Sequence, residues 1–251
     1  MKHRMIPAAR ALLLLTAAGA GAAAAREPSI PRSELPGIGG GDPRRAVDGD
    51  AAPWSALGRV QTELGGRCTG TLIGPRTVLT AAHCLVAATG RPVRPGSVHV
   101  LLGYRQGRWR AAARVTDFTI GAGYDAAARA PIGADWALLT LDAPAAAPGA
   151  ALPLLPGLPE AGAPAMLGGY QQDRPEVLMA DPACHVLGPV RRDGLPLLLH
   201  DCAGTRGSSG APLLVRLPGA GWAVAGVAVA VLRGEARGLA VPVAALRPGP
   251  P

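Results

Sequence analysis

One stretch of small residues could present a nucleophilic hydroxyl: it reads GTRGSSGAP over residues 204–212. A serine hydroxyl attacks a carbonyl only when a base takes its proton and nearby donors receive the oxyanion. Gly207 and Gly210 permit the sharp turn and the close approach to a substrate that such a site needs. By itself, a Gly-Ser-Ser-Gly sequence is more typical of a solvated hairpin turn, so other residues must support the chemistry.

Two further stretches offer a base and a group to orient it. The first reads VLTAAHC over residues 78–84, an apolar strand pattern that leads to His83. The second reads ADWALLTL over residues 134–141, where Asp135 precedes an apolar strand pattern. A catalytic imidazole needs an acceptor on one ring nitrogen, which fixes its tautomer and stabilises the imidazolium. Two rival acceptors are Asp117, inside a strand pattern, and Asp125, in a Gly-Tyr-Asp loop; the apolar continuation favours Asp135.

The three stretches resemble the catalytic blocks of the chymotrypsin-like (trypsin-fold) serine proteases. TAAHC, ADWALLTL and GSSGAPL stand in that family's order of His, Asp and Ser, and the likeness runs from about residue 46 to residue 243. The nearest subgroup is that of the bacterial secreted trypsin-like and glutamyl-endopeptidase-like proteases. The resemblance implies an all-β fold of two antiparallel six-stranded barrels with the active site in the cleft between them. It implies hydrolysis of polypeptide substrates through an acyl-enzyme, without metal or organic cofactor. We expect the protein to be a monomer.

The resemblance also implies a role for each site residue. His83 would act as general base, Asp135 would orient it, and Ser209 would be the nucleophile. Ser209 is preferred to Ser208 because Gly210-x-Pro212 follows it, as in the family. The amides of Gly207 and Ser209 would form the oxyanion hole. Animal members carry an aspartate where this chain has Ser208, which puts their activation switch in doubt here.

The predicted substrate preference rests on two charged or polar groups that members of the family use to bind the substrate side chain and that this chain lacks at the matching positions. Trypsin-like members carry a carboxylate about six residues before the nucleophile, where this chain has Ala203. Glutamyl endopeptidases carry a histidine in the strand after the nucleophile, and the matching stretch GVAVAV over residues 226–231 has none. A pocket lined by Ala203, Ala228 and Val229 would therefore favour small or medium apolar side chains.

The four cysteines are expected to form disulfides. An even number of cysteines in an exported chain indicates bridges, and four cysteines allow three pairings. The resemblance implies Cys68–Cys84, which leaves Cys184–Cys202. The alternative is a metal site formed with neighbouring histidines. No two cysteines have Cys-x-x-Cys spacing, so we expect no metal.

Short apolar runs separated by turn signals predict strands throughout, which favours an all-β sandwich or barrel over βαβ units. A proline-rich break over residues 142–165 divides a first barrel, about residues 46–145, from a second, about residues 160–251. The predicted strands cover residues 57–63, 67–73, 77–82, 97–102, 110–118, 136–141, 165–170, 176–187, 195–202, 211–216, 222–232 and 237–243.

The N-terminal region has three predicted parts. Residues 1–25 combine positive charges, an apolar core and an Ala-Ala-Ala sequence, which is the pattern of a signal peptide. Residues 26–45 are rich in proline and glycine, so a leader that is extended or disordered is expected. Arg45-Ala46 is a candidate maturation cleavage, with residues 46–251 as the peptidase domain. The protein would be secreted or periplasmic.

Composition excludes two other classes of function. The net charge is +8, but the arginines are scattered and aromatic residues make up only 3%, so no stacking platform with a basic stripe exists for nucleic acid. No long apolar segment follows the N-terminus, so no membrane span is expected in the mature protein. The remaining alternative is a non-catalytic binding protein of the same fold.

Overall fold

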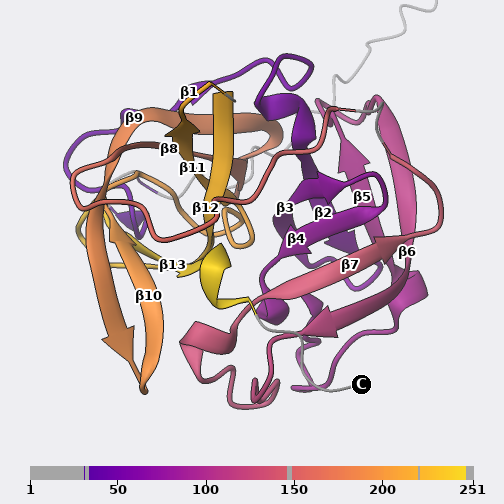
Figure 1. Ribbon diagram of the computed structural model, residues 1–251. Helices are drawn as coiled ribbons and strands as arrows, with labels where there is room; N and C mark the ends of the chain where they lie inside the picture. Colours follow the sequence, from indigo (N-terminus) through magenta and orange to yellow (C-terminus); the bar gives the residue numbers. More distant parts are fainter. Residues whose placement is uncertain (1–30, 32–33, 146–148, 220, 247–251) are drawn as a thin grey trace, which may run out of the picture.

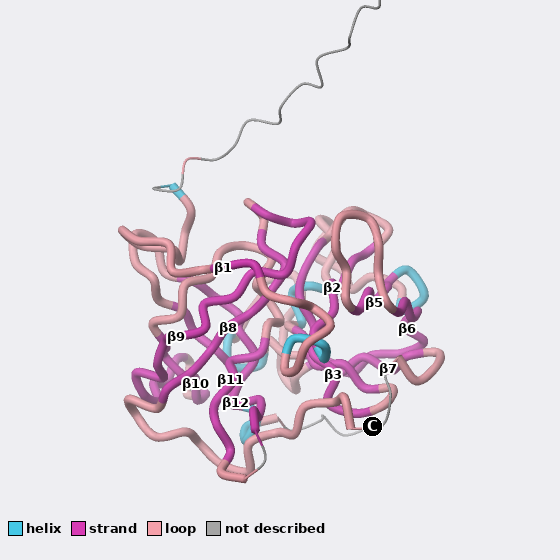
Figure 2. Tube along the Cα trace, turned by 90° about the horizontal axis from the view of Figure 1, so that it is seen from above, coloured by secondary structure: helices cyan, strands magenta, loops and turns pink. Residues whose placement is uncertain are grey.

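The apolar runs that predicted strands do form strands, arranged in two lobes that lie side by side (Figures 1 and 2). The computed structural model describes residues 31, 34–145, 149–219 and 221–246. The predicted signal peptide over residues 1–25 therefore lies outside the described residues. No helix among the described residues is long and apolar enough to cross a membrane.

The first lobe is a closed antiparallel barrel in the order β2-β3-β4-β7-β6-β5. Closure satisfies the backbone groups that would stay unpaired at a sheet edge. Large apolar side chains fill its interior, with Leu57, Leu72 and Leu139 fully buried. The strands of this lobe are β2 (Leu57–Thr62), β3 (Arg67–Gly74), β4 (Thr77–Thr80), β5 (Val98–Leu102), β6 (Ala111–Ile120) and β7 (Ala137–Leu141).

The second lobe is a ring of antiparallel strands in the order β9-β10-β13-β12-β11-β8, closed by pairing of β8 with β9. A short strand, β1 (Arg45–Ala46), adds to the outside of this ring by pairing with β9. The strands of the ring are β8 (Pro164–Gln171), β9 (Arg174–Arg192), β10 (Leu195–His200), β11 (Pro212–Leu217), β12 (Gly221–Val231) and β13 (Gly238–Pro242). The prediction of an all-β fold with two barrels is confirmed.

Helical structure in the described residues is limited to single turns of 3₁₀ helix. Two of these turns, η3 and η5, position candidate catalytic residues, as shown below. The turns are η2 (Trp54–Ala56), η3 (Ala82–Leu85), η4 (Pro95–Ser97), η5 (Ile132–Ala134) and η6 (Val243–Ala245). The last of them is short, as the proline-rich end of the sequence predicted.

The structure corrects one expectation about the N-terminal region. Residues 34–45 were expected to be extended or disordered, but they form turns and pack against the second lobe. Leu35 is 3% exposed, Ile38 is 1% exposed and Arg44 is 5% exposed. The boundary predicted between residues 45 and 46 falls inside strand β1. The burial of Leu35 and Ile38 and the hydrogen bonds of Arg44 order this segment despite its many prolines and glycines.

The cysteines form two disulfides, each within one lobe. Cys68 on β3 bonds to Cys84 in η3, and Cys184 on β9 bonds to Cys202 just after β10. This is the pairing that the family resemblance implied. Each bridge closes a loop of 16 to 18 residues, which stabilises the fold by roughly 3 kcal/mol in the chain-entropy account. The first bridge fixes the turn that carries His83, and the second leads into the loop that carries Ser209.

His200, the last residue of β10, is buried inside the second lobe. It is 1% exposed, and neither ring nitrogen has a hydrogen-bond partner in the part of the chain that is described. Burial lowers the pKa of its imidazole to about 4, because desolvation disfavours the charged form. The ring is therefore neutral at pH 7.

We expect His200 to reduce the free energy of unfolding by about 2 kcal/mol between pH 7 and pH 5. In the unfolded chain it takes a proton near pH 6.5, but in the folded protein only near pH 4. Its contribution is thus complete above pH 6.5 and is lost as the pH falls towards 4. Denaturant unfolding of the wild type and His200→Leu at both pH values measures this loss. A stability difference between the two proteins that does not change with pH would refute the assignment.

Candidate active site

The pairing of β4 with β7 brings His83 and Asp135 to the same edge of the first barrel. Thr80, the last residue of β4, lies opposite Ala137, the first residue of β7. Because the strands are antiparallel, the chain leaves β4 and enters β7 at one end of the barrel. The turn η3 then presents His83, and the turn η5 ends next to Asp135.

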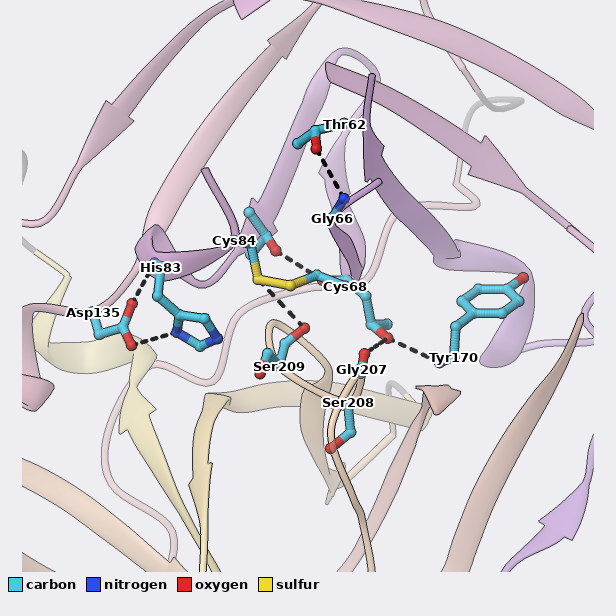
Figure 3. Close-up of a disulfide and its surroundings, with 12 residues drawn as sticks. Thr62, Gly66, Cys68, His83, Cys84, Asp135, Tyr170, Gly207, Ser208 and Ser209 are labelled. Carbon is cyan, nitrogen blue, oxygen red and sulfur yellow. Dashed lines mark hydrogen bonds and ion pairs between the residues drawn. A yellow bond between two sulfur atoms is a disulfide. The ribbon is translucent and has the colours of Figure 1, made fainter. Parts of the chain in front are cut away.

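His83 and Asp135 are joined by two hydrogen bonds (Figure 3). The Nδ1 atom of His83 lies 2.6 Å from Oδ2 of Asp135, and the backbone N–H of His83 donates to Oδ1 at 2.8 Å. Asp135 is 4% exposed, whereas the His83 side chain is partly exposed. A buried carboxylate at this distance holds the proton on Nδ1, which leaves Nε2 free to accept a proton from a nucleophile.

The two rival aspartates lie elsewhere. Asp117 is an exposed residue of β6, and the Oδ1 atom of Asp125 accepts hydrogen bonds from two amides of its own loop. Tyr124 is a neighbour of Asp135 that sequence reasoning missed. Its burial, followed by the nearby charge of Asp135, raises the pKa of its hydroxyl. The hydroxyl therefore stays neutral beside the carboxylate.

The loop that carries Ser209 runs from β10 to β11 and is fixed to the first barrel by Thr69 on β3. The backbone N–H of Thr69 donates to the Ser209 carbonyl at 2.9 Å, and its hydroxyl donates to the Gly207 carbonyl at 2.9 Å. Gly207 and Gly210 have φ angles of +92° and +81°, which favour glycine. A Cβ on Gly210 would collide with the Thr69 carbonyl. The two lobes thus meet at this loop.

In this loop the backbone N–H groups of Gly207 and Ser209 point away from the groups that bind the carbonyls of the preceding residues. The carbonyl of Arg206 accepts from the Gln172 amide and the carbonyl of Ser208 accepts from the Ala211 amide. In a planar trans peptide the following N–H points in the opposite direction. The N–H groups of Gly207 and Ser209 accordingly have no acceptor among the described residues.

Ser208 and Ser209 have different surroundings. The Ser208 hydroxyl is buried and donates to the Thr205 carbonyl at 2.6 Å, and in Figure 3 it points away from the His83 ring. Figure 3 draws Ser209 between the His83 ring and Gly207. No hydrogen bond joins the Ser209 hydroxyl to Nε2 of His83 within the described part of the chain. Catalytic hydrogen bonds are often long without substrate and tighten in the Michaelis complex.

A cavity of about 150 Å³ opens beside Ser209 and is lined mainly by small side chains of β12. Ala228 and Val229, both predicted to line a pocket, are among its lining residues, together with Ala230 and Val231. Ala203 is not, since it is fully buried against Leu35 and Ile38. The predicted pocket is therefore corrected at this position: the N-terminal segment covers Ala203. The other lining residues are Thr205, Arg206, Ser208 and Ser209.

Among the residues that the structure describes, two groups have the spacing of metal ligands, but their sulfur atoms are already bonded. One contains Cys68, His83 and Cys84, and the other contains Cys184, Asp201 and Cys202. In both groups the cysteines form a disulfide. A disulfide sulfur lacks the thiolate charge that binds zinc.

Two antiparallel barrels that meet at a loop of this kind define the trypsin-like class of fold. The chain belongs to the family of the trypsin-like peptidase domain, whose profile matches residues 68–218. It is also similar to a solved structure of a Glu endopeptidase in complex with MPD, with a TM-score of 0.69 and 21% identity over 83% of this chain and 94% of that chain. At that identity the likeness shows the fold. No curated protein matches the sequence.

Proposed function

We propose that this protein is a serine endopeptidase that cleaves peptide bonds through an acyl-enzyme on Ser209. One observation carries the proposal: the amides of Gly207 and Ser209 lack acceptors in the described structure, while the amides of Ser208 and Gly210 are bonded. Two such donors beside a serine are what a tetrahedral oxyanion requires. The proposed base is His83, which Asp135 holds in place; in Figure 3 it lies on the other side of Ser209 from Gly207.

The proposed reaction has two halves. His83 takes the proton of Ser209 through Nε2 as the hydroxyl attacks the carbonyl carbon, and the resulting imidazolium is stabilised by Asp135. The oxyanion is held by the two amides while the C–N bond breaks, and His83 gives its proton to the leaving amine. In the second half, His83 takes a proton from a water molecule as the water attacks the carbonyl carbon of the acyl-enzyme. The acid is then released, and His83 returns the proton to the Ser209 oxygen.

We propose that the cavity beside Ser209 accepts small or medium apolar side chains. Its walls are alanines and valines of β12, and its volume is about 150 Å³. A charged side chain would lose its hydration there unless a partner were present. Arg206 at the cavity is the one lining residue whose charge favours an alternative, an acidic side chain.

A panel of peptides that differ only in the residue before the cut tests this preference. With Ala, Val, Leu, Phe, Arg and Glu compared, we expect kcat/KM to be highest for Ala, Val or Leu, and at least about tenfold lower for Arg and Glu. This factor corresponds to roughly 1.4 kcal/mol of differential transition-state binding. The preference would be wrong if Arg or Glu were cleaved fastest. If a folded protein bound peptides without cleaving any, the alternative of a non-catalytic binding protein would replace the enzyme.

We also propose that the protein acts outside the cytoplasm. Two disulfides within a chain of this size are typical of oxidising compartments such as the periplasm or the extracellular space. The pattern of residues 1–25 agrees with export.

A further inference from the structure

Residues 34–44, the N-terminal arm, pack against the lobe that carries Ser209. Figure 1 draws this segment in indigo along the lobe that holds β8 to β13. Leu35 and Ile38 bury Ala203 in a small apolar cluster. Gly37 donates its N–H to the carbonyl of Leu232 at 2.9 Å and accepts from the N–H of Gly204 at 3.0 Å. The arm therefore contacts both the end of β12 and the start of the nucleophile loop.

Arg44, at the end of the arm, is fixed by three partners. Its side chain is fully buried and bonds to both carboxylate oxygens of Asp173, at 3.0 and 2.8 Å. It also bonds to both oxygens of Asp42 and to Oε1 of Gln171, the latter at 2.6 Å. Burial would lower the pKa of Arg44, but hydrogen bonds and charges from Asp42 and Asp173 raise it. A planar guanidinium with five donors suits such a site.

A continuous line of hydrogen bonds leads from Arg44 to the residue before Ser209. The same Oε1 atom of Gln171 that accepts from Arg44 also accepts from the N–H of Thr205, at 2.8 Å. The carbonyl of Thr205 in turn accepts from the N–H and the hydroxyl of Ser208, at 3.0 and 2.6 Å. The neighbouring Gln172 adds a side-chain bond to Thr205 and a backbone bond to the Arg206 carbonyl. That last bond sets the direction of the Gly207 amide.

We propose that Arg44 and Gln171 are positioning residues that hold the nucleophile loop in its oxyanion-binding shape, so that the uncleaved arm belongs to the working enzyme. The proposal rests on the peptidase function proposed above. The position before Ser209 is a serine bonded to its own loop, so the loop offers no carboxylate there for a freed N-terminal amine. The arm supplies the support from the other side, through a buried arginine.

The geometry around the Arg45–Ala46 bond agrees with an uncleaved arm. Arg45 and Ala46 form β1, paired with Ala180 and Met179 of β9. A protease must draw its substrate into an extended strand of its own cleft, and this segment is already paired and anchored by the buried Arg44. Cleavage there would also separate the arm from the chain that it supports.

The test removes the hydrogen-bond link through Gln171 and leaves the buried charge of Arg44 in place. Gln171→Leu removes the acceptor that joins Arg44 to Thr205, while Arg44 keeps both carboxylates. We expect kcat for a peptide substrate to fall at least about tenfold with KM changed less than about threefold, because the loss falls on the transition state. Gln171→Glu keeps the acceptor oxygens and is expected to retain kcat within about threefold. The matched control is Gln61→Leu, the same change on β2 in the first lobe.

The arm itself is tested by comparing the full chain with a form that starts at Ala46. Thermal unfolding checks that each variant is folded at the assay temperature. The proposal predicts that the shortened form, folded at the assay temperature, has lower kcat than the full chain; if it does not fold, Gln171→Leu alone decides. It is overturned if the folded shortened form is as fast as the full chain or faster, the latter making the arm an inhibitor, or if folded Gln171→Leu keeps the wild-type kcat. If the folded wild type cleaves no peptide and its Ser209 does not react with a fluorophosphonate, the peptidase function fails instead, and the proposal falls with it.

Discussion

Ser209→Ala is expected to reduce kcat for peptide hydrolysis by a factor on the order of 10⁵ to 10⁶, without unfolding the protein. The variant removes the oxygen that is proposed to form the acyl-enzyme. It leaves the His83–Asp135 pair and the two unbonded amides in place. The small remaining rate would come from these amides and from substrate binding. Rates with a cleavable peptide, together with the unfolding temperature of the variant, measure the effect.

The matched control is Ser208→Ala, the same change one residue earlier. The Ser208 hydroxyl is buried and bonded to the Thr205 carbonyl, so its loss loosens the loop without removing a reacting atom. We expect a decrease in kcat of no more than about tenfold, or roughly 1.4 kcal/mol. Equal losses in the two variants would contradict the assignment of Ser209 as nucleophile.

Asp135→Asn is expected to lower kcat by about 10⁴-fold at neutral pH. An amide of the same shape can still accept the His83 N–H, but it no longer compels the proton onto Nδ1. Without the carboxylate, the imidazolium of the proposed reaction would also lose its stabilising charge. Steady-state rates at several pH values, with the unfolding temperature as a check on folding, measure the effect.

Asp117→Asn serves as the control for this second variant. Asp117 is an exposed residue of β6 and was a rival for the same role in the sequence. We expect its kcat to stay within about twofold of the wild type, because surface substitutions rarely change stability by more than about 0.5 kcal/mol. A loss in Asp117→Asn as large as in Asp135→Asn would show that the carboxylate at 135 has no special role.

The strands and their grouping could be predicted because they follow local rules. Alternating or apolar runs bounded by glycine and proline mark strands, and the proline-rich break marks the passage between lobes. The candidate catalytic residues were found because each stands at the end of such a run. His83 follows β4, Asp135 precedes β7 and Ser209 lies in a glycine turn before β11.

The residues that sequence reasoning missed act over long separations in the chain. The sequence pattern predicts for Thr69 only a place in a strand, yet Thr69 anchors Gly207 and Ser209 across 138 and 140 residues. The sequence predicts a flexible leader around Arg44, because a charge among prolines and glycines is usually solvated. Its partner Gln171 lies 127 residues away, and no local pattern pairs them. The sequence also predicts Ala203 in the pocket, because no local pattern shows that the distant N-terminal arm buries this residue.

The most direct test of the proposed active site is reaction of the folded full chain with a fluorophosphonate, followed by mass spectrometry of its peptides. Such a reagent labels a serine only where a base and oxyanion donors act together. We predict one modified residue, Ser209, with labelling abolished in Ser209→Ala and strongly slowed in Asp135→Asn. A folded protein that takes up no label, or takes it up at Ser208, would contradict the proposed active site.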